Sequence, residues 1–326
     1  MSYFCAELTF FIEKNIEIYI QQDARWWKIM VDFFAPGMLF ALPDNSIYRF
    51  PSDYPYPREV YAPVWEGSGR NVPCVVVGPS DAERRIMLFH GNGETIQGAR
   101  SMALDIARCE LFTFTSSYLF RRAFWLISGS LVFRAMTRRC RARVFIIDYP
   151  GYWVDDNGSP PKPRTARGVY EAASSAAKLM RKECSAFHVV GYSLGTALAV
   201  RVARENADIV ESMSLIAPIC SALSAAASSP NESLRGLKAI ISIVKPLISP
   251  LDVFCAEKDA PFVATRSSVV YGDADTVVSA SQGIRMAKLL RASIMMVEGE
   301  DHTTIRGSGK ALAFVTRNVC DGGGPI

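Results

Sequence analysis

The chain has 326 residues, of which 49% are hydrophobic and 21% charged, and its formal net charge at pH 7 is +4. A chain of this size and composition can bury a large core, and we expect one large α/β domain. Lys and Arg are scattered and the net charge is mild, which argues against nucleic acid as a partner. The arginine-rich run RRCRAR (138–143) is the exception and is more typical of a solvated connection before a strand.

The cysteines and the first residues predict the compartment. Eight cysteines are spread singly, with no Cys-x-x-Cys pair and no Cys/His spacing that suits zinc, so the sequence implies no metal. This pattern fits reduced thiols and a cytoplasmic protein. The opening MSYFCAELTFFIEKN lacks a basic start and carries Glu7 within its apolar stretch, which does not predict a signal peptide.

In chain order, residues 1–64 are predicted to form a helical leader followed by coil. Residues 4–34 are apolar on a helical period with interleaved charges, which is typical of an amphipathic helix. Residues 41–81 are rich in proline and tyrosine and then become β-prone, which predicts irregular coil followed by short edge strands. The main domain is expected over 65–320, with a flexible tail at 321–326.

After the coil, short apolar runs alternate with helical stretches, which predicts a parallel sheet covered by helices on both faces. The predicted strands are 85–90, 143–148, 187–191, 213–218, 267–272 and 293–299. Two segments interrupt the alternation: a helical insertion at 111–140 and a candidate cap at 220–265. Reactive groups gather at the carboxyl ends of the strands in such sheets, so the residues after each run are the candidates for a site.

The stretch FHVVGYSLGTALAV (187–200) predicts a strand that turns sharply into a helix. Gly191 and Gly195 flank Ser193, as a strained turn without room for side chains requires. This Gly-x-Ser-x-Gly pattern is the nucleophile elbow, which exposes a serine hydroxyl. The alternative is a tight turn in which Ser193 only caps the helix.

The first predicted strand is followed by HGNGET (90–95). Gly91 and Gly93 would let main-chain N–H groups point at a ligand, and such donors could hold an oxyanion. A dinucleotide-phosphate loop is the alternative, but the third glycine, Gly98, comes one residue too late for Gly-x-Gly-x-x-Gly.

A serine nucleophile needs a base, and the chain has three histidines. His188 lies within the strand that leads to Ser193, and His90 belongs to the turn before the oxyanion donors. His302 remains, directly after the last predicted strand, and is the predicted base.

The base in turn needs a carboxylate that fixes its tautomer. Asp275 follows the penultimate strand in YGDADTVV (271–278) and is the first choice. Asp273 and Asp252 are alternatives, and Asp301 is disfavoured because adjacent side chains project apart.

Five motifs, in this order, resemble the α/β-hydrolase superfamily, whose nucleophile, acid and base follow the same order. They are HGNGE (90–94), DYPG (148–151), GYSLGT (191–196), YGDADTVV (271–278) and EGEDH (298–302). Within the superfamily the HGN and DYPG forms resemble the small α/β-hydrolase-domain proteins, a branch with depalmitoylases and lipases that act on lysophospholipids and monoacylglycerols. The insertion and the leader have no counterpart in these relatives.

The resemblance implies the α/β-hydrolase fold and a role for each site residue. It makes Ser193 the nucleophile, Asp275 the acid and His302 the base, and it gives the oxyanion hole to the backbone N–H groups of Asn92 and Leu194. It predicts a serine hydrolase of acyl esters or thioesters, with a lipid or a lipidated protein as substrate and no cofactor. A serine peptidase of the same fold and a non-catalytic binding protein are the alternatives.

The segment LFTFTSSYLFRRAFWLISGSLVF (111–133) is strongly apolar but contains Arg121 and Arg122. A membrane crossing here would separate the strands that end at His90 and Asp148, although both belong to one sheet. We therefore expect a helix beside the site that contacts a membrane surface or an acyl chain, with packing against the protein body as the alternative.

Overall fold

The computed structural model describes residues 62–63, 71–72, 74–94, 96–108, 110–112, 137–139, 142–149, 166–230, 241, 252 and 254–320. The expected helix at 4–34, the interior of the insertion, most of 231–253 and the tail lie outside these residues.

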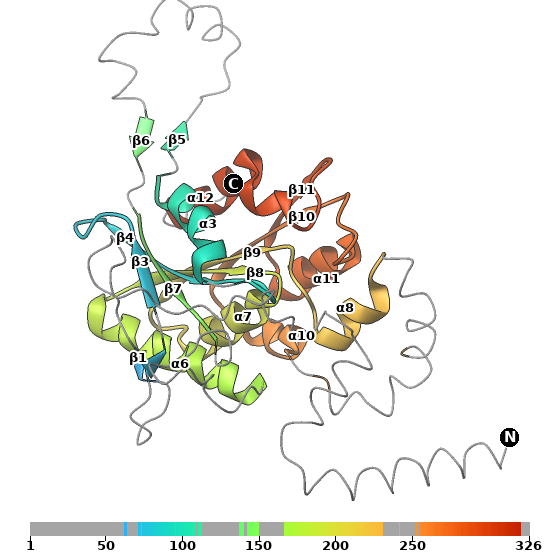
Figure 1. Ribbon diagram of the computed structural model, residues 1–326, viewed down its shortest axis with the longest axis horizontal. Coiled ribbons are helices and arrows are strands. Elements are labelled where there is room, and N and C mark those ends of the chain that lie inside the picture. The colour runs from blue at the N-terminus through green and yellow to red at the C-terminus, as the bar shows by residue number, and fades with distance from the viewer. Residues whose placement is uncertain are drawn as a thin grey trace, which may run out of the picture.

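The centre of the fold is a seven-stranded sheet with strand order β11-β10-β9-β8-β4-β7-β3 (Figure 1). Its strands are β3 (Cys74–Val77), β4 (Arg84–Phe89), β7 (Ala142–Ile147), β8 (Phe187–Tyr192), β9 (Val210–Ile216), β10 (Arg266–Gly272) and β11 (Ser293–Val297). All neighbours are parallel except β3, which pairs antiparallel with β7 at one edge. The six strands predicted from apolar runs are confirmed, and so is the expected short strand at the sheet edge.

Helices cover both faces of this sheet (Figure 1). They are α3 (Ile96–Arg108), α6 (Ala166–Glu183), α7 (Gly195–Glu205), α8 (Ala222–Ser228), α10 (Ala256–Asp259), α11 (Ala280–Leu290) and α12 (Gly309–Cys320), with the short 3₁₀ helices η3 (Ala260–Phe262) and η4 (Thr304–Gly307). Helices α3 and α12 contribute to one buried cluster, and α6, α7 and α11 contribute to the other. Successive strand residues alternate between the clusters: Val189 belongs to the α7 side and Val190 to the α3 side.

Two short antiparallel pairs lie outside the central sheet. Strand β1 (Ala62–Pro63) pairs with β2 (Asn71–Val72), and β5 (Glu110–Phe112) pairs with β6 (Thr137–Arg139). The β5–β6 pair joins the two ends of the 111–140 insertion. Arg138 and Arg139 thus lie in β6, shortly before β7, and the described ends of the insertion are strands where a helical insertion was expected, because each end supplies the other with a hydrogen-bonding partner.

The cysteines differ from the expectation at one position. Cys74, Cys184, Cys220 and Cys255 are free thiols, whereas Cys320 is disulfide-bonded. The expectation of reduced thiols is wrong for Cys320, because spacing along the chain does not show which thiols the fold brings together.

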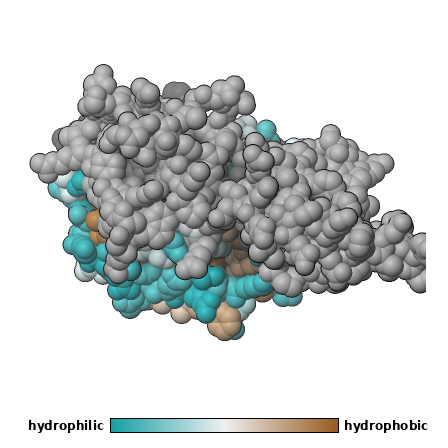
Figure 2. Space-filling view, turned by 60° about the horizontal axis from the view of Figure 1, so that its bottom comes forward, coloured by the Kyte–Doolittle hydropathy of each residue, from teal (hydrophilic) through white to brown (hydrophobic). Residues whose placement is uncertain are grey.

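The described part of the face in Figure 2 is mostly hydrophilic, with hydrophobic residues in separate areas. The large hydrophobic side chains that are most exposed among the described residues are Val277, Phe262, Ile284, Ile294 and Met296. Among the described helices, none is both long enough and apolar enough to cross a bilayer.

Candidate active site

Ser193 stands at a strained turn between β8 and α7. Its φ is 51°, in the left-handed region that non-glycine residues rarely adopt. Its N–H donates to the Ile216 carbonyl oxygen at 2.9 Å, which ties the turn to β9. A Cβ on Gly195 would lie 2.2 Å from the Phe89 carbonyl oxygen, so α7 can begin this close to β4 only with glycine there.

The side chain of Ser193 does not cap α7. The capping position is Leu194, and it makes no side-chain hydrogen bond to the helix. Instead, the Ser193 Oγ lies 3.0 Å from Nε2 of His302. The alternative of a helix-capping serine is therefore wrong, and the hydroxyl faces an imidazole.

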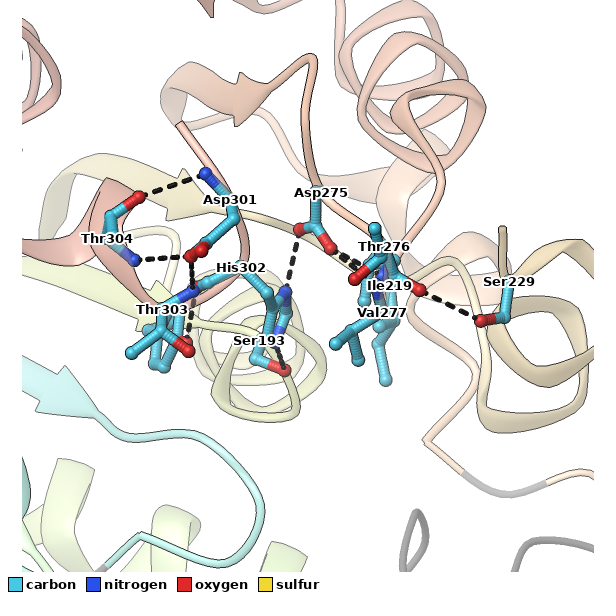
Figure 3. A network of polar contacts seen from close by, with 12 residues as sticks. Ser193, Ile219, Ser229, Asp275, Thr276, Val277, Asp301, His302, Thr303 and Thr304 are labelled. Atoms are coloured by element: carbon cyan, nitrogen blue, oxygen red, sulfur yellow. Dashed lines mark hydrogen bonds and ion pairs between the residues drawn. The ribbon is translucent and has the colours of Figure 1, made fainter. Parts of the chain in front are cut away.

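Asp275 completes a row of three side chains that come from three loops at the carboxyl ends of strands (Figure 3). Its Oδ2 lies 2.7 Å from Nδ1 of His302. Its Oδ1 accepts hydrogen bonds from the N–H groups of Val277 and Val278, both at 2.8 Å. These two donors fix the carboxylate, which in turn orients the imidazole with Nε2 toward Ser193.

The other aspartates that the sequence offered have different partners. Asp273 accepts from the Gly299 N–H at 2.7 Å, and Asp252 accepts from the Leu223 N–H at 3.1 Å. Asp301 accepts from the N–H groups of Thr303 and Thr304. Each therefore stabilises a turn or a helix start, while Asp275 is the one of the four that meets His302.

The remaining histidines are buried away from this row. His188 donates to or accepts from the Ser212 hydroxyl at 2.7 Å, and its Nε2 lies 3.3 Å from the Glu211 carboxylate. Burial, together with the positive charges of Arg84 and Arg266, lowers the pKa of His188 to about 3. His188 is thus held neutral inside the sheet, in agreement with its expected place in the strand.

His90 forms a buried pair with Asp148 at the ends of β4 and β7. Its Nε2 lies 3.2 Å from Asp148 Oδ1, and both side chains are fully buried. Burial lowers the pKa of His90, but the hydrogen bond and the charge of Asp148 outweigh it, so the pKa is raised overall. The Tyr149 hydroxyl donates to the His90 carbonyl oxygen at 2.7 Å. These contacts fix the point at which the HGNGE loop leaves the sheet.

The loop that carries Asn92 lies beside Ser193. A Cβ on Gly91 would lie 3.4 Å from the Ser193 Cβ, and Gly93 has a φ of 72°, as the expected glycine-dependent turn requires. Leu194 directly follows Ser193 in the elbow. The roles of the Asn92 and Leu194 N–H groups as oxyanion donors stay predictions.

Sequence reasoning missed three residues around this row. The Tyr192 hydroxyl donates to the His302 carbonyl oxygen at 2.7 Å, across 110 residues of sequence. Arg306 and Glu94 form an ion pair across 212 residues. No local period or motif signals such contacts. Among the described residues no group of His, Cys, Asp and Glu side chains is arranged to hold a metal ion.

Comparison with known proteins places the chain in a family. Residues 86–317, more than half of the chain, match the Alpha/beta hydrolase family. The chain belongs to this family. The matched range includes Ser193, Asp275 and His302. The central sheet with its covering helices is the α/β-hydrolase fold that the resemblance of the five motifs predicted.

Solved structures show the same fold at low sequence identity. The carboxylesterase EstE1, cloned from a metagenomic library, is 17% identical over 82% of this chain and 89% of its own, with a TM-score of 0.52. The Pyrococcus furiosus esterase Pf2001 is 12% identical over 80% of this chain and 92% of its own, with a TM-score of 0.50. The thioesterase domain from the curacin biosynthetic pathway is 12% identical over 79% of this chain and 98% of its own, also at 0.50. A search of curated protein sequences found no match.

Proposed function

We propose that the protein is a serine hydrolase that cleaves ester or thioester bonds of acyl substrates through an acyl-enzyme on Ser193. The observation that carries this proposal is the row in which Ser193 Oγ lies 3.0 Å from His302 Nε2 and His302 Nδ1 lies 2.7 Å from Asp275 Oδ2. Both distances are within hydrogen-bond range for a nucleophile, its base and the group that orients the base.

The geometry defines the first step. Asp275 accepts a hydrogen bond from Nδ1–H and so holds the proton on that nitrogen, which leaves the Nε2 lone pair free to take the Ser193 proton as Oγ attacks the substrate carbonyl carbon. The carbonyl oxygen becomes an oxyanion, for which we propose the backbone N–H groups of Asn92 and Leu194 as donors. His302 then gives its proton to the leaving oxygen or sulfur, and an ester of Ser193 remains.

Water completes the reaction by the same route. His302 takes a proton from water, the hydroxide attacks the acyl carbon, and Ser193 leaves with the proton returned from His302. The products are a carboxylic acid and an alcohol or thiol. No step needs a metal or an organic cofactor.

The substrate class is proposed from the apolar surroundings of the row. Val277, which is 37% exposed, and the buried Ile219 lie beside Asp275 (Figure 3). We propose that this side of the site receives an acyl chain of a lipid or a lipidated protein, as in the depalmitoylase and lipase branch that the motifs resemble. A further part of this proposal is a membrane-surface contact through 111–133, on the basis of its apolar sequence with paired arginines.

A panel of purified substrates tests the proposal. It contains 4-nitrophenyl esters of two to twelve carbons, a palmitoyl thioester peptide, a monoacylglycerol, a lysophospholipid and a peptidyl 4-nitroanilide. We expect turnover of the esters and thioesters that increases with acyl length, and background rates with Ser193→Ala. Preferential cleavage of the anilide would instead support a peptidase, and equal rates for Ser193→Ala would refute the proposed mechanism.

A further inference from the structure

A partly buried ion pair joins two loops of the site that lie far apart in sequence. Glu94 belongs to the HGNGE loop after β4, and Arg306 belongs to η4, four residues after His302. The Glu94 side chain is 9% exposed and the Arg306 side chain 30%. Removing charges from water even in part is costly, and such a pair is therefore weak evidence for stability as such. Its position between two functional loops suggests a role in their placement.

The second oxygen of Glu94 holds its own loop. While Oε1 meets Arg306, Oε2 accepts a hydrogen bond from the Gly91 N–H at 3.2 Å. The side chain lies over Gly98 in the first turn of α3, where a Cβ would come within 2.9 Å of Glu94 Cγ. One carboxylate thus connects Gly91, the residue before Asn92, to Arg306.

Tyr192 makes a second tie between the same loops. Its hydroxyl donates to the His302 carbonyl oxygen at 2.7 Å, and its ring lies against Gly91, where a Cβ would come within 2.9 Å of Cε1. Burial raises the pKa of Tyr192, so the hydroxyl keeps the proton that it donates. The elbow is therefore in contact with both loops that Glu94 and Arg306 join.

We propose that Glu94 and Arg306 are positioning residues for the reaction, an inference that rests on the proposed function. Their ion pair sets the distance between the loop with Gly91 and Asn92 and the loop with His302. Stabilisation of an oxyanion needs donors at a fixed position relative to the nucleophile and base. Loss of the pair leaves ground-state binding intact and weakens the transition state.

A double-mutant cycle with Glu94→Gln, Arg306→Gln and the double variant tests this inference. Gln at 94 is close to isosteric and keeps an oxygen for the Gly91 N–H, so it removes mainly the charge. Because a displacement of about 1 Å costs on the order of 10²-fold, we expect each variant to lower kcat by about 10- to 100-fold. KM for 4-nitrophenyl butyrate should change by less than about threefold. The double variant should lose no more than the worse single variant, since both changes break one interaction.

One further readout and a control variant separate positioning from a general structural role. A trifluoromethyl ketone forms a tetrahedral oxyanion adduct with serine, so its affinity should fall by the same factor as kcat. The matched control is Arg181→Gln, which breaks the ion pair of Arg181 with Asp208 (2.5 Å) between α6 and the turn before β9. It should keep the wild-type kcat. Thermal unfolding and circular dichroism establish that each variant is folded.

The outcomes distinguish this inference from the proposed function. Folded Glu94→Gln and Arg306→Gln variants with the kcat and ketone affinity of the control would overturn the positioning role while the hydrolase activity stands. Additive losses in the double variant would also overturn it, because the residues would then act separately. A folded wild-type protein that neither turns over the ester nor binds the ketone would overturn the proposed function and this inference with it.

Discussion

Substitution of Gly195 by alanine should impair catalysis more than stability. The added Cβ would lie 2.2 Å from the Phe89 carbonyl oxygen and 2.6 Å from that of His90. Ordinary van der Waals contact begins at 3.4 Å, so the closer approach is 1.2 Å too short (3.4 − 2.2). Both neighbours are backbone atoms of fully buried residues, so either α7 or the end of β4 must move by about 1 Å.

The magnitudes follow from that displacement. Overpacking costs about 1–3 kcal/mol, and the better helix propensity of alanine offsets about 1 kcal/mol of it, so the free energy of unfolding should fall by about 0–2 kcal/mol. The same movement separates Ser193 from the loop that follows His90. A misplacement of about 1 Å costs on the order of 10²-fold in rate, and we expect kcat/KM for 4-nitrophenyl butyrate to fall by about that factor.

Gly309→Ala is the matched control for this substitution. Gly309 is the first residue of α12, and a Cβ there meets nothing within 4 Å. It should keep the wild-type kcat/KM, with equal or slightly higher stability in urea unfolding. A Gly195→Ala enzyme with kcat/KM within threefold of the wild type would refute the argument that close approach of α7 to β4 sets the site geometry.

Asp275→Asn should lower kcat by about 10⁴. The amide has one oxygen, which cannot replace both the Oδ1 that accepts from the Val277 and Val278 N–H groups and the Oδ2 that accepts from the His302 Nδ1–H. Asp273→Asn should keep near-normal turnover, and the reverse result would show that the acid is misassigned. His188 has a pKa of about 3 in the fold and 6.5 in the unfolded chain, so the unfolded chain takes up the proton first and stability is lost as pH falls from 6.5 toward 3. Between pH 7.0 and 5.0 the free energy of unfolding in urea should fall less for His188→Gln than for the wild type, with a difference of up to about 1.4 kcal/mol per pH unit below pH 6.5. Equal falls for the two proteins would contradict this. Replacement of 113–137 by a short linker should reduce liposome binding and the ratio of long-chain to short-chain ester turnover, and a folded variant that keeps both would show that the segment is no lipid contact.

The sequence predicted the parts of the molecule that are encoded locally. Strands such as β8 are short apolar runs, and the glycines around Ser193 mark a turn whose geometry excludes larger residues. The position of His302 after the last strand also follows from chain order, because carboxyl ends of parallel strands meet at one edge.

Contacts between distant segments could not be predicted in this way. The ion pair of Glu94 with Arg306 and the bond of Tyr192 to His302 depend on how loops meet after the sheet has formed. The sequence ranked Asp275 first among four aspartates, but only the fold shows that Asp275 is the one within hydrogen-bond distance of His302. The disulfide at Cys320 and the β5–β6 pair could not be predicted for the same reason, because the spacing of residues along the chain does not identify the partner in either case.

Covalent labelling of Ser193 tests the central claim most directly. The wild-type protein is incubated with a fluorophosphonate, which reacts with activated serines, and the adduct is measured by intact mass and located by peptide mapping. We expect one adduct per chain, on the peptide that contains Ser193, and no adduct on a folded Ser193→Ala variant. Equal labelling of that variant, or no adduct on the folded wild-type protein, would contradict the account.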